Sequence, residues 1–531
     1  MKNYWIFHRF WPNSNGLPSD GVSRRFWGKA KGLLPPETVI WVVAWLVLMW
    51  AGRERLFQDP GTFWHLAWGN QILETGRLPR VEQFSFTRAG QPVVADQWLA
   101  EVLMALMHRL TGWDGLLLLT ATCLACVYSW MGNRLIQAGL NPGWVALLLA
   151  IGFLASAHNF HCRPLIATLC LLPLWFAGLL AVERKRRQIG YLWIFVPISA
   201  LWANLHGGIL AGLGTLFLCA IFWMLIGWRN QLGPVQSAGQ AVHLLVITMA
   251  CFAAVLVNPY GLQLPKTWDA TLRMNLGQWI QEHRAWGPGE PAGWAAMALA
   301  GVYLVLLGRR IRDGQLLASW TLPLIWFCLG LQRVRNLPLF AEIALVALAD
   351  LAGPPSPNGL RDAPQTNPCP YFPWPANRRK YLIPTLLVSL AVGLYLFGAA
   401  VPVVGSGWVR FSPERWPVGL LPQLQSHSHP CPDECKIFND LEFGGWLIYF
   451  APQWRVFIDD RCALYGEDFL AAYHQARFQS PDQLNHWQQE YRFRWALVRQ
   501  GSRLDRYLCG HPYWQQIGRD QAAGLYRFVG P

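Results

Sequence analysis

The chain has 531 residues, of which 53% are hydrophobic and only 14% are charged. Soluble domains have about 25% charged residues, so this composition excludes an ordinary soluble enzyme and predicts an α-helical polytopic membrane protein. The formal charge of +14 does not indicate nucleic-acid binding, because no nucleic-acid module accompanies it and basic residues collect in cytoplasmic loops.

Residues 1–36 are aromatic and basic and contain no short apolar stretch that ends in a cleavage site. We therefore expect a cytoplasmic segment there, not a signal peptide. Eleven apolar segments follow that are long enough to cross a bilayer at about 1.5 Å per residue. They are residues 37–52, 115–132, 142–158, 164–182, 189–203, 207–228, 240–257, 292–308, 314–331, 337–352 and 381–402.

Basic clusters orient these segments. The cluster in residues 24–31 precedes the first span and predicts a cytoplasmic N-terminus. Alternation then places the basic runs 183–188, 309–312 and 378–380 on the cytoplasmic side as well. The outer face would hold the loops 53–114 and 258–291, several short turns and everything after residue 403.

The agreement among the basic clusters requires that residues 97–111 do not cross the membrane. This segment contains Glu101, His108 and Arg109, so we expect an amphipathic helix that lies in the interface. Residues 353–377, which include eight prolines, are predicted to form a cytoplasmic linker.

The C-terminal residues 403–531 differ from the rest. Short β-prone runs begin at Lys436, Gly445, Arg455 and Arg494, and a helical stretch covers residues 467–478. This pattern predicts a small α/β domain outside the membrane, after a membrane domain of residues 37–402. Cys431 and Cys435 are expected to form a disulfide. The alternatives are a pair of free thiols, or a zinc site with His427 and His429, which the Cys-x3-Cys spacing fits only loosely.

Residues 53–114 carry a family resemblance. Asp59 opens this loop, residues 63–73 and 96–110 would form two interfacial helices, and Trp64-His65 and Trp98–Glu101 are short motifs within it. The loop resembles the first outer loop of the GT-C glycosyltransferases, which include protein O-mannosyltransferases, the lipid A aminoarabinose transferase and oligosaccharyltransferases. Over most of its length the chain is most similar to uncharacterised bacterial members of that superfamily.

The resemblance implies a GT-C-like arrangement of about 11 transmembrane helices in a bacterial inner membrane. It also implies a glycosyltransferase that moves a sugar from a polyprenyl-phosphate donor to a lipid, glycan or protein acceptor at the periplasmic face, with inversion. One carboxylate serves this chemistry by accepting the proton of the incoming hydroxyl. Two other hypotheses stay open: a non-catalytic envelope-assembly scaffold, and a transporter or flippase of lipid-linked glycans.

Asp59 is the base that the resemblance favours, although Asp-Pro is also an ordinary helix start. Asp96 and Glu101 are the alternative carboxylates, and His65 could orient a carboxylate or the acceptor. The first outer loop has no Asp-x-Asp, so no metal or other cofactor is predicted.

For the donor phosphate we expect arginine, which is always charged and binds phosphate oxygens in a fork. Arg333 and Arg335 lie on the predicted outer side, against the usual bias, and Arg163 ends another outer turn. Arginines that reach toward the interface are the alternative interpretation. Asn204 and His206 flank a helix break before two glycines and are further candidates for substrate binding.

Overall fold

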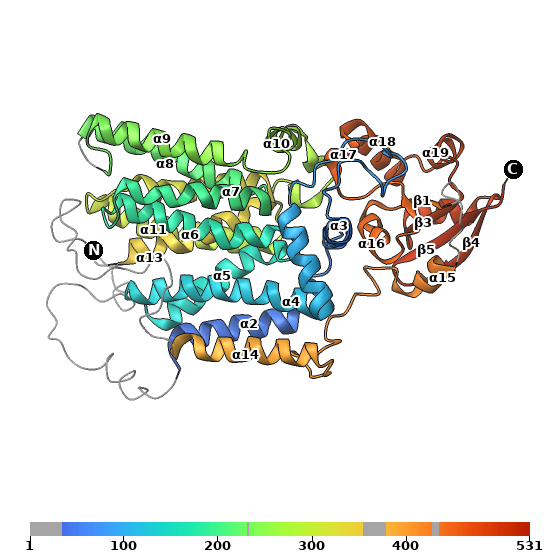
Figure 1. Ribbon diagram of the computed structural model, residues 1–531, viewed down its shortest axis with the longest axis horizontal. Coiled ribbons are helices and arrows are strands. Elements are labelled where there is room, and N and C mark those ends of the chain that lie inside the picture. Colours follow the sequence, from blue (N-terminus) through green and yellow to red (C-terminus); the bar gives the residue numbers. More distant parts are fainter. Residues whose placement is uncertain (1–33, 231–232, 354–378, 427–434, 531) are drawn as a thin grey trace, which may run out of the picture.

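The computed structural model describes residues 34–230, 233–353, 379–426 and 435–530. The basic cluster at 24–31, almost all of the proline-rich linker and Cys431 lie outside these ranges, and so does the expected Cys431–Cys435 pairing. Within the described ranges the chain forms a bundle of apolar helices with an α/β domain at one end (Figure 1).

Each of the eleven apolar segments expected from the sequence is helical. The main helices are α2 (Pro36–Arg55), α4 (Trp98–Gln137), α5 (Pro142–Ser156), α6 (Leu165–Glu183), α7 (Phe195–Leu205), α8 (Ile209–Asn230), α9 (Ala238–Ala254), α11 (Pro291–Arg312), α12 (Leu322–Gln332), α13 (Leu337–Ala352) and α14 (Arg379–Leu396). By length and composition, five described helices can cross a membrane, in α4, α5, α6, α8 and α11. The chain is therefore a membrane protein, and the expected number of eleven spans stays a prediction.

Two of the expected spans are shortened by tight turns. The segment expected at 189–203 begins with a 3-10 helix at Ile189–Ile194 before α7, and the segment expected at 314–331 begins with one at Ala318–Thr321 before α12. These turns leave α7 and α12 with 11 residues each.

Helix α13 is the centre of the bundle. Every residue from Leu337 to Leu351 is buried, and the helix packs against α4, α5, α6, α11 and α12. A helix that is apolar all round has to be surrounded in this way. Arg333 and Arg335 lie in the turn directly before this buried helix, so α13 fixes their position at the end of the bundle.

The amphipathic segment 97–111 is separated from the span that follows it, as expected. The helix α4 is interrupted at Gly112, whose φ of 65° lies in the left-handed region that favours glycine. The part before the break packs on α3 (Gly61–Thr75), where Arg109 binds Glu74 at 2.8 Å and Asn70 at 2.9 Å. The first outer loop therefore contains a pair of packed helices.

The α/β domain is built on a five-stranded mixed sheet in the order β2-β1-β3-β5-β4. Strands β1 (Lys436–Asn439), β2 (Arg455–Val456) and β3 (Trp495–Arg499) are parallel, whereas β4 (Trp514–Arg519) and β5 (Ala523–Phe528) pair as an antiparallel hairpin that joins β3. This sheet confirms the predicted mixture of strands and helices in this region.

Both faces of the sheet are covered. Ile437 and Leu497 belong to the core that continues into the helical bundle, whereas their neighbours Phe438 and Ala496 belong to a second core on the opposite face. Figure 1 shows the helices on either side of the strands. They are α15 (Leu421–Ser426), α16 (Leu441–Phe450), α17 (Cys462–Tyr465), α18 (Glu467–Phe478), α19 (Gln483–Tyr491) and α20 (Arg503–Gly510).

The prediction of a strand that begins at Gly445 is wrong, because residues Leu441–Phe450 form the helix α16. The run is apolar on all sides, and such a short run does not distinguish a buried strand from a buried helix. Gly445 explains the packing of α16: a Cβ at this position would lie 2.2 Å from the carbonyl oxygen of Pro60. The helix therefore rests directly on the peptide that follows Asp59.

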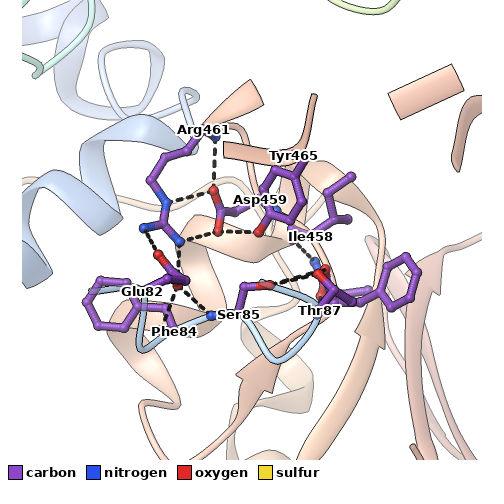
Figure 2. A network of polar contacts seen from close by, with 10 residues as sticks. Glu82, Phe84, Ser85, Thr87, Ile458, Asp459, Arg461 and Tyr465 are labelled. Carbon is purple, nitrogen blue, oxygen red and sulfur yellow. Dashed lines mark hydrogen bonds and ion pairs between the residues drawn. The ribbon is translucent and has the colours of Figure 1, made fainter. Parts of the chain in front are cut away.

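The first outer loop is bound to the α/β domain through Arg461 (Figure 2). The guanidinium of Arg461 donates to Glu82 at 2.6 and 3.0 Å and to Asp459 at 2.7 and 2.9 Å. Ser85 also forms a parallel bridge with Val456 of β2, so the loop extends the edge of the sheet. These contacts fix the domain against the end of the bundle.

Candidate active site

A cavity of about 1990 Å³ lies between the end of the helical bundle and the α/β domain. Its walls come from the first outer loop, the turns before α6, α8 and α13, residues 267–284 and the α/β domain. The sequence-predicted residues that line it are Asp59, His65, Asp96, Arg163, His206, Arg333 and Arg335. The structure thus brings together residues from distant parts of the chain.

Asp59 lies at the start of α3 and is 8% exposed. Its Oδ1 accepts the backbone N–H of Gly61 at 2.7 Å, which begins the helix, and its Oδ2 forms an ion pair with Arg163. The interpretation of Asp59 as a helix-start residue therefore holds for Oδ1, whereas Oδ2 pairs with Arg163 at the cavity wall.

Arg163 joins two carboxylates. Besides Asp59 it binds Glu282 through Nη2 at 2.9 Å, and Glu282 lies 3.9 Å from Arg335. Arg335 in turn donates to Nε2 of His283. The result is a row of alternating charges along the wall of the cavity.

The two arginines of this row determine the protonation states of Glu282 and His283. Burial opposes ionisation of Glu282, but the guanidinium groups of Arg163 and Arg335 hold its pKa well below the usual value. Burial and the charge of Arg335 lower the pKa of His283 to about 3, so its imidazole is neutral and accepts the hydrogen bond from Arg335. Near neutral pH Glu282 is therefore ionised between the two guanidinium groups, and His283 is neutral.

Two further arginines at the cavity have no such partner. Arg333 and Arg284 line the same wall, and among the described residues no carboxylate forms an ion pair with either side chain. Arg333 lies two residues before Arg335 in the turn Val334–Asn336. These two guanidinium groups are therefore positive charges at the cavity that have no ion pair within the described part of the chain.

His65 and Glu101 form a buried pair. Nδ1 of His65 lies 2.8 Å from Oε1 of Glu101, which is fully buried behind the cavity wall. Burial, together with Arg163, keeps the pKa of His65 well below its usual value. Glu101 therefore orients His65, and His65 is the member of the pair that lines the cavity.

The remaining predicted residues have different positions. Asp96 lines the cavity, and its Oδ2 accepts the indole N–H of Trp268 at 3.2 Å. Asn204 lies outside the cavity lining and ties the start of α4 to the end of α7: it accepts from the Trp98 indole at 2.7 Å and donates to the carbonyl of Val257 at 2.9 Å.

His206 presents a defined tautomer. Its Nδ1 accepts the backbone N–H of Gly208 at 2.9 Å and lies 2.8 Å from the hydroxyl of Thr168. A backbone N–H can only donate, so the proton of the neutral ring is on Nε2. His206 thus offers an N–H donor at the cavity.

Several buried polar atoms around the cavity have no hydrogen-bond partner. They are Nε1 of Trp64, Nε of Arg163, Oδ1 of Asp460 and Nδ1 of His158, His161 and His283. Buried polar groups are nearly always hydrogen-bonded, and each exception needs an explanation. A polar ligand or water in the cavity would give these atoms the partners that the protein does not supply.

Sequence reasoning missed three residues of this site: Glu282, Asp460 and Arg461. Glu282 stands beside Arg284 in a loop that gave no sign of meeting Arg163. The Asp459-Asp460-Arg461 triplet is visible in the sequence, but the hydrogen bond from Arg461 to Glu82 joins residues 379 positions apart. Across the described ranges, no group of three or more His, Cys, Asp or Glu is arranged to hold a metal ion.

No family model and no curated protein matches this chain. Among solved structures, it is similar to an oligosaccharyltransferase of Archaeoglobus fulgidus in the apo form, with 12% identity and a TM-score of 0.49 over 87% of this chain and 69% of that one.

The chain is also similar to ArnT from Cupriavidus metallidurans. The ArnT structure bound to undecaprenyl phosphate has 15% identity and a TM-score of 0.48, over 92% of this chain and 97% of that one. The apo ArnT structure has 14% identity and a TM-score of 0.39, over 93% and 98%. Both kinds of enzyme belong to the GT-C superfamily that residues 53–114 resemble. All three TM-scores are below 0.5, so the function proposed for this chain rests on its own residues.

Proposed function

We propose that this protein is a membrane glycosyltransferase that moves a sugar from a polyprenyl-phosphate donor to an acceptor hydroxyl in the cavity. The observation that carries the proposal is the buried Asp59 carboxylate, which shares the cavity with Arg163, Arg335 and the unpaired Arg333. A single site thus combines a proton acceptor with cations for a phosphate.

The reaction requires these two features together. Asp59 accepts the proton of the acceptor hydroxyl as the new C–O bond forms at the anomeric carbon, and attack from the opposite face inverts that carbon. The bond to the phosphate oxygen breaks at the same time, and its electron pair leaves on the phosphate. Arg333, Arg335 and Arg284 stabilise that charge from the wall of the cavity.

The proposed location follows the charges of the loops. With the basic runs 183–188 and 309–312 in the cytoplasm, the cavity and the α/β domain lie on the outer side of a bacterial inner membrane. The undecaprenyl phosphate in the ArnT structure is the type of lipid carrier that we propose here. The acceptor is a lipid, a glycan or a protein.

Binding of the carrier alone tests the phosphate half of this proposal. Purified full-length protein in lipid nanodiscs is titrated with undecaprenyl phosphate, and with undecaprenol as a ligand that has the same tail but no phosphate. Each good charge contact contributes about 3 kcal/mol, so Arg333→Gln should weaken phosphate binding by about 100-fold and leave undecaprenol binding unchanged.

Arg273→Gln is the matched control, because this arginine lies on the predicted outer side but is exposed and pairs only with Asp269 in its own helix, α10 (Gln263–Arg273). It should bind like the wild type. Equal binding of undecaprenyl phosphate and undecaprenol by the wild type would rule out a phosphate site in this cavity.

A further inference from the structure

The cavity contains a second carboxyl group from a different domain. Asp460 follows β2 in the α/β domain and lines the cavity near Asp59. A Cβ placed on Gly61 would lie 3.0 Å from Oδ1 of Asp59 and 3.2 Å from Oδ2 of Asp460. The two carboxyl groups therefore approach the same point above Gly61, where any other residue would separate them.

Asp460 has none of the partners that stabilise its neighbours. Asp459 binds Arg461 and the Tyr465 hydroxyl, and Asp59 binds Arg163 and Gly61. By contrast, Oδ1 of Asp460 is buried without a hydrogen bond, and the nearby indole of Trp64 makes no well-aligned bond to it. A buried carboxylate without a partner is costly, and a second carboxylate beside it makes ionisation still less favourable.

Electrostatics support the same conclusion. Burial, and then the charges of Asp59 and Asp459, raise the pKa of Asp460 well above its usual value, and they outweigh the opposing effect of the Trp64 indole. Arg163 also interacts electrostatically with Asp460, but it already serves Asp59 and Glu282. The other titratable neighbour, Cys462, is buried, and burial also raises its pKa, so the thiol is neutral.

The protonation state of Asp460 affects how well the cavity can bind an anionic donor. With Asp460 protonated, Asp59 and Glu282 balance Arg163 and Arg335, and Arg333 and Arg284 remain for an anionic ligand. An ionised Asp460 would add a negative charge at the place where a phosphate has to enter.

We propose that Asp460 is the second carboxyl group of the transfer site, and that the Asp59–Asp460 pair holds one proton, on Asp460, while the donor phosphate binds. This inference rests on the proposed function for the identity of the ligand. In the reaction, Asp59 takes the proton of the acceptor hydroxyl. One of the two protons then on the pair leaves to water, which restores the starting state.

Infrared titration tests whether Asp460 carries the proton, and it needs no ligand. Difference spectra of purified full-length wild type against Asp460→Asn should show a protonated carboxyl band near neutral pH that belongs to Asp460. In Asp59→Asn the repulsion is gone, so the same band should disappear at a lower pH than in the wild type. Asp468→Asn, an exposed carboxyl of the same domain, is the control and should not change the band.

Binding of undecaprenyl phosphate at increasing pH tests the consequence. As Asp460 ionises, wild-type affinity should fall relative to Asp460→Asn, by up to about tenfold per pH unit. The phosphate titrates equally in both proteins, so the ratio of the two affinities isolates Asp460. Asp468→Asn should behave like the wild type.

Two results would overturn the inference: no wild-type band that depends on Asp460 near neutral pH, or an affinity ratio that does not change with pH. If undecaprenyl phosphate does not bind the wild type at all, the proposed function fails, and the infrared titration still decides where the proton is. A band that disappears when a divalent cation is added would also contradict the proposal, because it would show that the pair holds a metal.

Discussion

The carboxylate of Asp59 is ion-paired with the guanidinium of Arg163, across a gap of about a hundred residues, at the wall of a cavity that both line. This contact joins the first outer loop to the turn before α6. It gives a buried carboxylate an ion-pair partner and holds both side chains at a fixed position beside the cavity.

Arg163→Gln should destabilise the protein and abolish sugar transfer. The side chain is 15% exposed and serves both Asp59 and Glu282, so its removal leaves two poorly solvated carboxylates without their shared partner. Breaking such a pair costs about 3 kcal/mol or more. Thermal unfolding in detergent measures the loss.

Arg163→Lys is the conservative control. Lysine keeps the charge but cannot bind both carboxylates in a fork, so we expect an intermediate stability. If Arg163→Gln unfolds at the wild-type temperature, the ion pair does not contribute to the fold as described.

Stability should fall as the solution is acidified, and His283 should account for part of the fall. Burial and Arg335 lower its pKa from 6.5 to about 3, so the unfolded state binds a proton that the folded state rejects between these values. Stability therefore rises with pH in that window, by at most about 1.4 kcal/mol per pH unit for one such group.

The matching measurement is denaturant unfolding at several pH values. In His283→Gln the slope of stability against pH between these two pKa values should be smaller than in the wild type. His486→Gln is the control, because this histidine is exposed on α19. Equal slopes for the wild type and His283→Gln would mean that His283 titrates normally.

Arg461→Leu should release the α/β domain from the first outer loop. The guanidinium is 7% exposed and is the shared partner of Glu82 and Asp459, so its loss leaves two buried carboxylates. We expect faster hydrogen exchange in residues 82–87 and 455–465, with unchanged exchange in the central helix α13. Arg494→Leu, which changes an exposed arginine of the same domain, should leave the exchange pattern unchanged.

A wild-type exchange pattern in Arg461→Leu would contradict the role assigned to this residue. The same variant should also lose transfer activity, since Asp460 and the rest of the α/β domain complete the wall of the cavity.

Helix positions were predictable because they depend on local patterns. Apolar runs gave all eleven helical segments, and the charged residues of 97–111 gave the separation from the span after Gly112. Boundaries were less predictable: the 3-10 turns before α7 and α12 shorten these helices, and nothing in the apolar pattern marks them.

The site was predictable where a residue is unusual for its place. Asp59, Arg163 and Arg335 are charges at the ends of apolar segments, and the structure places all three at one cavity. Glu282 and Asp460 could not be found in this way, because they lie in polar loops where charge is ordinary. Their roles come from tertiary contacts that link distant segments. The helix at Gly445 was missed for the same reason, because it packs against Pro60.

The most direct test of the account is complementation of a deletion strain with Asp59→Asn, followed by profiling of its lipids and glycans. Asparagine keeps the shape of the side chain but cannot accept the proton, and Asp269→Asn, at an exposed position on α10, is the control. The account predicts that the wild type and Asp269→Asn restore the missing glycoform, whereas Asp59→Asn reaches the membrane and restores none of it. Full restoration by Asp59→Asn would contradict the central claim.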